Sequence, residues 1–201
     1  MSMIDTLRDY LLDYSQAADP AEREAIESKV WRQFGAERAV LVLDMSGFSL
    51  LTRRHGVIHY LSMVRRMQET VRPIVHDHEG SIVKFEADNG FAVFPDPESA
   101  IRAAIEMNRV SDRQNAEVSE EYGIHLSCGI DHGRILLIEG RDFFGDPVNT
   151  ASKLGEDLAD PGEILVTRTA MKALGDETDL AGNEIELSLS GIRLEACSIA
   201  Y

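Results

Sequence analysis

Two stretches within the first 35 residues carry apolar side chains three or four positions apart, a spacing that predicts amphipathic helices: Ile4, Leu7, Leu11 and Tyr14 in the first, and Ile26, Val30 and Phe34 in the second. Between them, Asp19, Pro20 and Glu22 are typical of a helix start, and Gly35 is a natural end. Each helix has an apolar face. The pattern leaves open whether these faces pack on the rest of the chain or on a second chain.

From Ala36 the pattern changes to strands alternating with helices. We expect a strand at 39–44, a long helix, a hairpin at 82–94, a helix from Asp96, strands at 124–130 and 135–138, a helix from Asp146, a strand at 163–167 and two final strands. The long helix presents one apolar face, made of Ile58, Leu61, Val64, Val71, Ile74 and Val75. The order βαββαβ predicts an α+β fold with a ferredoxin-like core, an antiparallel sheet with helices on one face, followed by C-terminal αβ additions. We therefore expect a helical N-terminal extension over 1–36 and one domain over 37–201.

Two aspartates fall where strands are expected to end. Asp44 closes the strand at 39–44, and Asp88 lies in the turn of the hairpin, where Asn89-Gly90 is a strong hairpin signal because both residues tolerate positive φ. If the first strand pairs beside the hairpin, the two carboxylates converge at one end of the sheet. Such a pair suits Mg²⁺ or Mn²⁺, and hence metal-assisted phosphoryl chemistry. The alternative is that Asp88 favours the turn and Asp44 caps the segment that follows.

Composition restricts the classes of function. The chain has 201 residues, a formal net charge of −15, 44% hydrophobic and 27% charged residues, as in an ordinary globular protein. The acidic balance argues against sequence-independent nucleic-acid binding, which needs a basic surface. Cys128 and Cys197 lie in apolar runs and indicate small core residues rather than a disulfide. With no long apolar stretch and no signal-peptide pattern, we expect a cytoplasmic protein without a membrane partner.

Four segments resemble a known family. They are Leu43-Asp44-Met45-Ser46-Gly47-Phe48-Ser49, Val83-Lys84-Phe85-Glu86-Ala87-Asp88, the run Asp142-Phe143-Phe144-Gly145-Asp146-Pro147-Val148-Asn149-Thr150-Ala151-Ser152-Lys153, and Pro161-Gly162-Glu163-Ile164-Leu165-Val166. In content and order they resemble the class III nucleotidyl cyclases, the catalytic domains of adenylate and guanylate cyclases. The resemblance extends from about Ala36 to the C-terminus, and the third segment is the most specific.

The resemblance implies a phosphorus–oxygen lyase that converts ATP to cyclic AMP and pyrophosphate. Asp44 and Asp88 match the family's metal-binding aspartates, and the carbonyl of Met45 would supply a backbone ligand for one of two Mg²⁺ or Mn²⁺ ions. One metal would activate the ribose 3′-hydroxyl and the other would hold the triphosphate. The hydroxyl would then attack the α-phosphorus in line.

The resemblance also assigns nucleotide-binding residues. Lys84 and Asp142 match the pair that reads the purine in adenylate-type members, and donor–acceptor chemistry suits adenine, although guanine also presents one donor and one acceptor. Asn149 matches the asparagine that orients the ribose. In this family the site forms across a homodimer, with the metal aspartates from one chain and Lys84, Asp142, Asn149 and Lys153 from the other.

Several positions depart from the family pattern. Lys153 stands where the family has a transition-state arginine, and lysine lacks the planar multi-donor fork; its alternative role is a surface lysine paired with the nearby acids. Ser190 stands about where a triphosphate-binding lysine is common, Ala87 replaces a glycine, and the 133–142 stretch is shorter than the family's dimer arm. These departures keep two alternatives open: a weak or inactive nucleotide-sensing or dimerisation module, and a guanylate cyclase.

Overall fold

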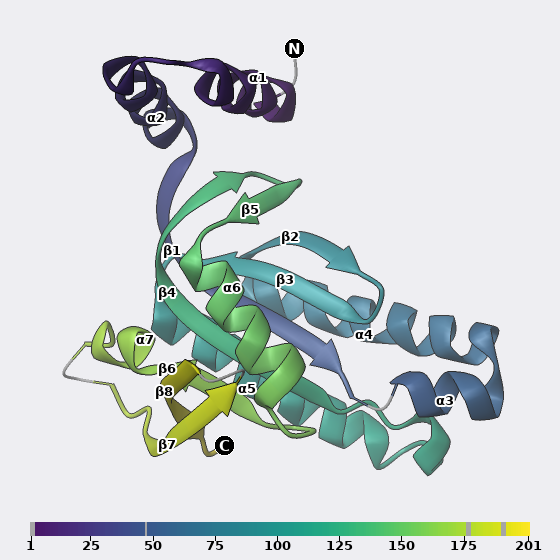
Figure 1. Cartoon of the computed structure of the whole chain (residues 1–201). Helices are drawn as coiled ribbons and strands as arrows, with labels where there is room; N and C mark the ends of the chain where they lie inside the picture. The colour runs from purple at the N-terminus through teal and green to yellow at the C-terminus, as the bar shows by residue number, and fades with distance from the viewer. Residues whose placement is uncertain (1–2, 47, 176–177, 190–191) are drawn as a thin grey trace.

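The computed structural model describes residues 3–46, 48–175, 178–189 and 192–201 (Figure 1). Its helices are α1 (Met3–Gln16), α2 (Pro20–Phe34), α3 (Phe48–His55), α4 (Val57–Asp77), α5 (Pro97–Asn115), η1 (Glu120–Tyr122), α6 (Asp146–Ser152) with its π-helical continuation η2 (Lys153–Leu158), and α7 (Arg168–Lys172). Its strands are β1 (Gly35–Met45), β2 (Ser81–Glu86), β3 (Asn89–Phe94), β4 (Leu126–Ile138), β5 (Asp142–Phe144), β6 (Ile164–Thr167), β7 (Gly182–Leu189) and β8 (Ile192–Ile199).

The strands form one sheet in the order β2-β3-β1-β4-β6-β8-β7, and β5 pairs with the far end of β4. Every pairing is antiparallel except that of β4 with β6. The α+β class and the mainly antiparallel sheet confirm the predicted fold. The expectation of helices on one face was incomplete, because α4 and α5 cover one face while α6 crosses the other (Figure 1).

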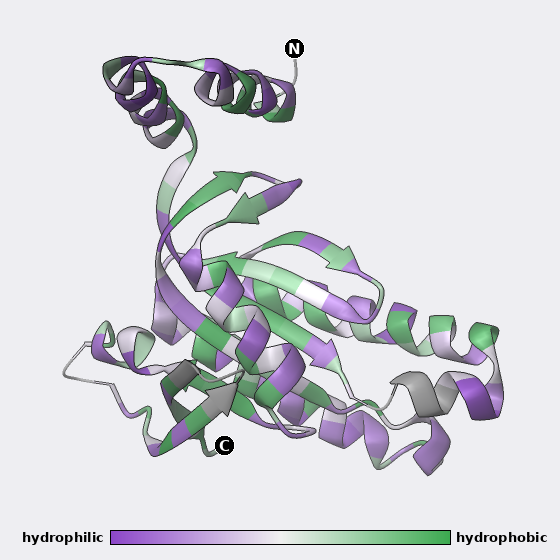
Figure 2. Cartoon of the chain, viewed as in Figure 1, coloured by the Kyte–Doolittle hydropathy of each residue, from purple (hydrophilic) through white to green (hydrophobic). Residues whose placement is uncertain are grey.

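Strand β1 lies in the middle of this arrangement and is buried on both faces. Leu41 and Leu43 pack in the same cluster as Ile101 of α5, on one side. Val40 and Val42 point to the other side and pack in a cluster with Ala151 of α6. A strand covered on both faces needs a continuous apolar run, and Figure 2 shows hydrophobic colouring along the central strands.

The N-terminal helices pack on the sheet domain through the end of β4. Asp19 caps α2 by accepting a hydrogen bond from the Ala21 amide at 3.0 Å, as the sequence predicted. Val30 and Phe34 of α2 are buried in one cluster with Leu7 of α1 and Ile138 of β4. The face of α2 therefore packs within its own chain. Leu11, Leu12 and Tyr14 of α1 are exposed, so only part of the predicted α1 stripe is buried.

Three local predictions needed correction. The hairpin turn consists of Ala87 and Asp88 rather than Asn89-Gly90, because Glu86 pairs with Asn89 and Ala87 takes the positive φ of 53°. The strands expected at 124–130 and 135–138 are one continuous strand over Leu126–Ile138, since β1 pairs without a break from Leu126 to Leu136 and β5 pairs with its last three residues.

The third correction concerns α4. Ile58 and Leu61 were expected on its apolar face but are 76% and 52% exposed. The first turns of α4 lie with α3 beyond the edge of the sheet, where no strand covers them (Figure 1). The buried face consists of Tyr60, Met63, Val64, Met67, Val71, Ile74 and Val75.

Two glycines allow α6 and η2 to lie directly on the sheet. A Cβ at Gly129 of β4 would lie 2.1 Å from the Ala151 carbonyl oxygen, and a Cβ at Gly155 would lie 2.6 Å from the Val42 carbonyl oxygen. Real Cβ atoms do not approach backbone this closely, so these positions require glycine. The contact fixes the depth at which α6, which carries Asn149, sits on the sheet.

Candidate active site

The two aspartates are brought to the same end of adjacent strands. Leu43 of β1 pairs with Gly90 of β3, so Asp44 lies one residue beyond that pair on β1 and Asp88 lies two residues beyond it, in the turn that leads into β3. This convergence was predicted from the strand ends. It depends on β1 pairing between β3 and β4 rather than at an edge of the sheet.

The electrostatics of Asp44 reflect this convergence. Burial, the charge of Asp88 and the charge of Glu156 raise the pKa of Asp44 from 3.8 to about 6, while a hydrogen bond from the Met45 amide acts in the opposite direction. The pKa of Glu156 is also raised, first by its partial burial. No sequence pattern singled out Glu156, which follows Gly155 at the point where η2 packs closely on Val42 of β1.

Tyr60 of α4 is a further neighbour that the sequence did not reveal. Burial, followed by the charge of Asp88, a hydrogen bond with Asp88 and the charge of Asp44, raises the pKa of its phenol to about 12. The phenol therefore stays protonated at neutral pH and is available as a donor to the carboxylates. Its signal in the sequence was only a position on the buried face of α4, which alone indicates a core residue.

Lys84 and Asp142 form an ion pair. Lys84 Nζ of β2 lies 3.2 Å from Asp142 Oδ1 of β5 and 3.4 Å from Glu86 Oε2. Partial burial alone would lower the pKa of Lys84, but the contacts with Asp142 and Glu86 outweigh it and the pKa is raised. The ammonium also lies 5.2 Å from the centre of the Phe91 ring. The lysine and aspartate side chains are 32% and 29% exposed, so a ligand can reach both groups.

Asn149 and Lys153 lie on one stretch of helix, in α6 and at the start of η2. Asn149 is exposed and Lys153 is half-buried. Within the part of the chain that the structure describes, Lys153 forms no ion pair, so the alternative in which it neutralises neighbouring acids does not hold. Its ammonium is therefore available to an anionic ligand.

The donor set at Asp44 and Asp88 fits a hard divalent cation that keeps other ligands. Burial is the first cause of the raised Asp44 pKa and the charge of Asp88 the second, and a cation beside the two carboxylates would offset both effects. The described ranges contain no group of three or more His, Cys, Asp or Glu side chains placed to hold a metal. A site with two carboxylates suits Mg²⁺ or Mn²⁺ completed by backbone oxygen, water and substrate phosphates.

Two other features bear on the predictions. Ser190, predicted to stand in place of a triphosphate-binding lysine, lies outside the described residues. Among the helices that the structure describes, none combines the length and apolar character needed to cross a bilayer.

The matches to known proteins agree on one family. The family described as "Adenylate and Guanylate cyclase catalytic domain" matches residues 33–195. A Rhizobium meliloti (strain 1021) protein named "Putative adenylate cyclase 3" is 29% identical over 142 residues, which are 71% of this chain and 24% of that protein. The Mycobacterium tuberculosis (strain H37Rv) protein Rv2212 is 31% identical over 72% of this chain and 36% of its own length.

Solved structures agree with these matches. The adenylate/guanylate cyclase/hydrolase from Silicibacter pomeroyi has a TM-score of 0.70 and 26% identity, covering 83% of this chain and 98% of that one. The adenylyl cyclase CyaB from P. aeruginosa has a TM-score of 0.69 and 19% identity, covering 83% and 96%, a likeness of fold alone. The chain thus spans nearly all of these solved domains but only about a quarter to a third of the two curated relatives.

Proposed function

Since this chain belongs to the family of adenylate and guanylate cyclase catalytic domains, we propose that it converts ATP to 3′,5′-cyclic AMP and pyrophosphate. The observation that carries the proposal is the convergence of Asp44 and Asp88, with its raised Asp44 pKa, in a chain that also pairs Lys84 with Asp142. The first pair suits the triphosphate end of a nucleotide and the second suits its base. We also propose that 37–201 is the catalytic domain and that 1–36 is a helical extension of it.

The metal-binding role falls to Asp44, Asp88 and the Met45 carbonyl. Two Mg²⁺ or Mn²⁺ ions held there would supply activation of the ribose 3′-hydroxyl and neutralisation of the triphosphate charge. The chain itself holds the two carboxylates, with Tyr60 beside them, in a partly buried position. Partial burial reduces the screening of their charges by water. Asp44, whose pKa is about 6, is mostly ionised at neutral pH and more fully above it, which favours metal binding there.

Base selection falls to Lys84 and Asp142. The lysine donates to a ring nitrogen of adenine, and the aspartate accepts from its exocyclic amine. In the nucleotide-free protein the two side chains satisfy each other at 3.2 Å, so the base has to replace their contact with its own hydrogen bonds. Each of these two half-buried charges therefore has an ion-pair partner between turnovers.

Asn149 orients the ribose, and the Lys153 ammonium neutralises charge that develops on the phosphate during attack. We place these residues and the Lys84–Asp142 pair of one chain opposite the aspartates of a second chain, so that the working site forms in a homodimer. Among the residues that the structure describes, no acid forms an ion pair with Lys153 that would have to be displaced. A lysine delivers one point charge where an arginine would deliver a fork, and turnover is accordingly modest.

One observation favours a second candidate. Lys153 in place of arginine suits a domain that binds nucleotide without efficient chemistry, such as a sensing or dimerisation module. That module would retain binding of nucleotide with Mn²⁺ and yield no cyclic product.

The test is to incubate the purified chain with Mn²⁺ and equal ATP and GTP, beside the Asp44→Ala variant, and to identify products by mass spectrometry. Cyclic AMP from the unchanged chain alone supports the proposal, and cyclic GMP in excess replaces it with a guanylate cyclase. Bound nucleotide without a cyclic product supports the sensing module. Equal product from Asp44→Ala, after contamination is excluded, removes the two-metal mechanism.

A further inference from the structure

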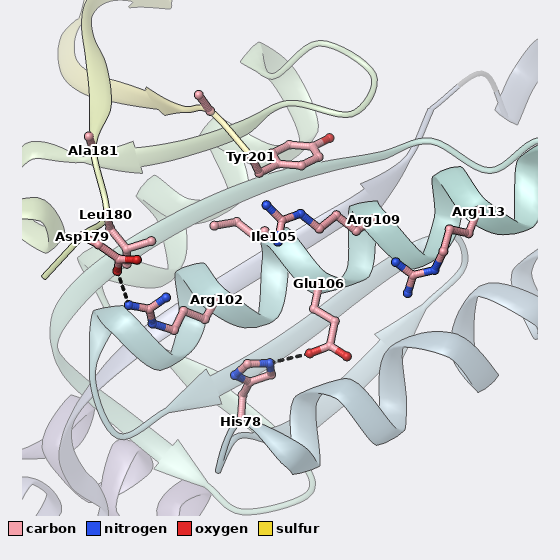
Figure 3. A pocket seen from close by; sticks show the side chains of 11 residues that line it. His78, Arg102, Ile105, Glu106, Arg109, Arg113, Asp179, Leu180, Ala181 and Tyr201 are labelled. Carbon is pink, nitrogen blue, oxygen red and sulfur yellow. Dashed lines mark hydrogen bonds and ion pairs between the residues drawn. The ribbon is translucent and has the colours of Figure 1, made fainter.

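A cavity of about 540 Å³ lies on the outer side of α5, and none of the residues assigned to the candidate active site lines it (Figure 3). Its walls come from α5, the end of α4, the segment 179–181 and the end of the chain after β8. The inner side of α5 packs on the face of the sheet opposite to α6. The cavity is therefore separate from the proposed cyclase chemistry, and its volume is typical of small-molecule sites.

Three arginines line this cavity from one side of α5. Arg102, Arg109 and Arg113 are separated by seven and four positions, which places them on the same helix face, and Figure 3 shows them along that helix. In a chain with a net charge of −15, the lining of this cavity carries three guanidinium groups against two carboxylates, Glu106 and Asp179. The local field at this place therefore favours an anion.

The acids that line the cavity already have partners. Asp179 forms an ion pair with Arg102, whose hydrogen bond is the main cause of a lowered Asp179 pKa, and Arg102 also contacts Glu98 at 2.7 Å. Glu106 Oε2 lies 2.8 Å from His78 Nε2 (Figure 3). Arg102 and His78 are thus the partners of the two carboxylates in the lining, those of Asp179 and Glu106.

Arg109 and Arg113 remain without such compensation. Neither forms an ion pair with another residue in the described ranges. Two guanidinium groups one helical turn apart can each present a planar fork to the oxygens of a tetrahedral anion. A phosphate group has enough charge and oxygen atoms to bind both forks at once, whereas a carboxylate carries a single charge and two oxygens.

The lining of the cavity is also partly apolar. Ile105 of α5, Leu180 and the ring of Tyr201 contribute to it. The Tyr201 hydroxyl donates a hydrogen bond to the Gly162 carbonyl at 2.6 Å, which fixes the ring. Apolar side chains beside uncompensated cations suit a ligand that has an organic body as well as an anionic group.

We propose that this cavity binds a small organic phosphate, with the phosphate group between Arg109 and Arg113 and the organic body against Ile105, Leu180 and Tyr201. Because no residue of the proposed cyclase site takes part, the assignment does not depend on the proposed function. Inorganic phosphate shares the charged group but lacks the body, so it binds more weakly.

The test is a titration of the full ¹⁵N-labelled chain with phenyl phosphate in metal-free buffer, followed by amide chemical shifts. Shifts are expected at Ile105, Arg109, Ala181 and Ala200 and not at Lys84 or Asn149. In Arg109→Gln/Arg113→Gln, binding weakens about tenfold or more, the effect of losing charge-assisted hydrogen bonds. The matched control, Arg8→Gln/Arg32→Gln, removes two exposed arginines of α1 and α2 and leaves the affinity within about twofold.

Arg109→Lys/Arg113→Lys keeps the charge without the forks and is expected to bind with intermediate affinity. Inorganic phosphate and phenol titrations complete the series, and both are expected to bind more weakly than phenyl phosphate. The proposal is overturned by the lack of saturable shifts at about 10 mM phenyl phosphate. Equal binding by Arg109→Gln/Arg113→Gln also overturns it, as does an affinity for inorganic phosphate or for phenol that matches that for phenyl phosphate.

Discussion

Lys84 Nζ lies 3.2 Å from Asp142 Oδ1, so one ion pair joins strand β2 to the short strand β5. The two residues are 58 positions apart in the sequence and lie on strands that do not pair with each other. Both side chains are about one-third exposed, and an ion pair of this exposure contributes about 0–1 kcal/mol to stability. Its main consequence is therefore expected in ligand recognition rather than in folding.

Lys84→Met tests this expectation. Under the proposed function, loss of the donor reduces kcat/KM for ATP by about tenfold or more, because a hydrogen bond to a charged group contributes about 1.5–3 kcal/mol. The unfolding midpoint shifts little. Steady-state kinetics and thermal unfolding measure the two effects. Lys29→Met, at an exposed position of α2, is the control. A large loss of stability with unchanged kcat/KM would give the pair a purely structural role.

Lys153→Arg is expected to raise kcat by about tenfold, since a guanidinium fork makes more charge-assisted hydrogen bonds to a phosphate than an ammonium does. In the described part of the chain no ion pair holds Lys153, so the substitution breaks none of those that the structure shows. The rate of cyclic AMP formation with Mn²⁺ is the measurement. The control, Lys172→Arg at an exposed position of α7, should leave the rate unchanged. A lower rate in Lys153→Arg would mean that the site is shaped for lysine.

Asp44→Asn is expected to stabilise the metal-free chain at pH 7.5. The pKa of Asp44 is raised in the folded state to about 6 from an ordinary 3.8, so the native state binds this proton more tightly. Its favourable contribution is present below pH 4 and is lost as the pH rises to about 6. The gain at pH 7.5 is about 1–2 kcal/mol, less than the full shift implies because Asp44 is only partly buried.

Thermal unfolding at several pH values measures this effect. The difference between Asp44→Asn and the unchanged chain should grow between pH 4 and pH 6 and then level off. Mn²⁺ should raise the unfolding midpoint of the unchanged chain and not that of Asp44→Asn. A difference that does not vary with pH would exclude Asp44 as the titrating group.

Ala87→Gly is expected to stabilise the hairpin. Ala87 has a φ of 53°, in the left-handed region, which costs an L-residue about 1 kcal/mol relative to glycine. Denaturant unfolding should show a gain of about 0.5–1 kcal/mol. Ala173→Gly at the end of α7, where φ is −85°, serves as the control and should lose stability instead. Equal losses in both variants would show that the turn relaxes around Ala87.

Gly155→Ala is expected to destabilise the chain by about 1–3 kcal/mol, because its Cβ would lie 2.6 Å from the Val42 carbonyl oxygen. The helix that carries Asn149 and Lys153 would move outward, so cyclase activity should fall at temperatures where the chain is still folded. Gly175→Ala has open space around its Cβ and should change the unfolding midpoint little. Full activity in a folded Gly155→Ala would separate the depth of α6 from catalysis.

Much of the fold and part of the site followed from local patterns. The caps of α2 and α5, the hairpin, and the strands β1 and β6 were predicted because capping, turn chemistry and apolar runs act over a few residues. The convergence of Asp44 and Asp88 was predicted from two strand ends. Their roles, and those of Met45, Lys84, Asp142, Asn149 and Lys153, remain predictions carried by family resemblance.

Local patterns did not predict the features that depend on how the elements pack together. Ile58 and Leu61 were wrongly assigned to the buried face of α4, because amphipathic spacing does not show where a helix leaves the sheet. The turn moved from Asn89-Gly90 to Ala87-Asp88, since the pairing of β3 with β1 extends through Gly90 and requires it in the strand.

The sequence by itself determined the order of elements, the acidic balance and the four family segments, because each is written in neighbouring residues. Only the tertiary structure placed Tyr60 and Glu156 beside the aspartates, brought Asp142 against Lys84, and brought Leu180 and Tyr201 to the cavity that the α5 arginines line. These groups come together through the order of strands and through the packing of helices on both faces of the sheet, including the close approach of η2 to β1 and β4 at Gly155. Such contacts join residues that are distant along the chain, and no local pattern records which of them will meet.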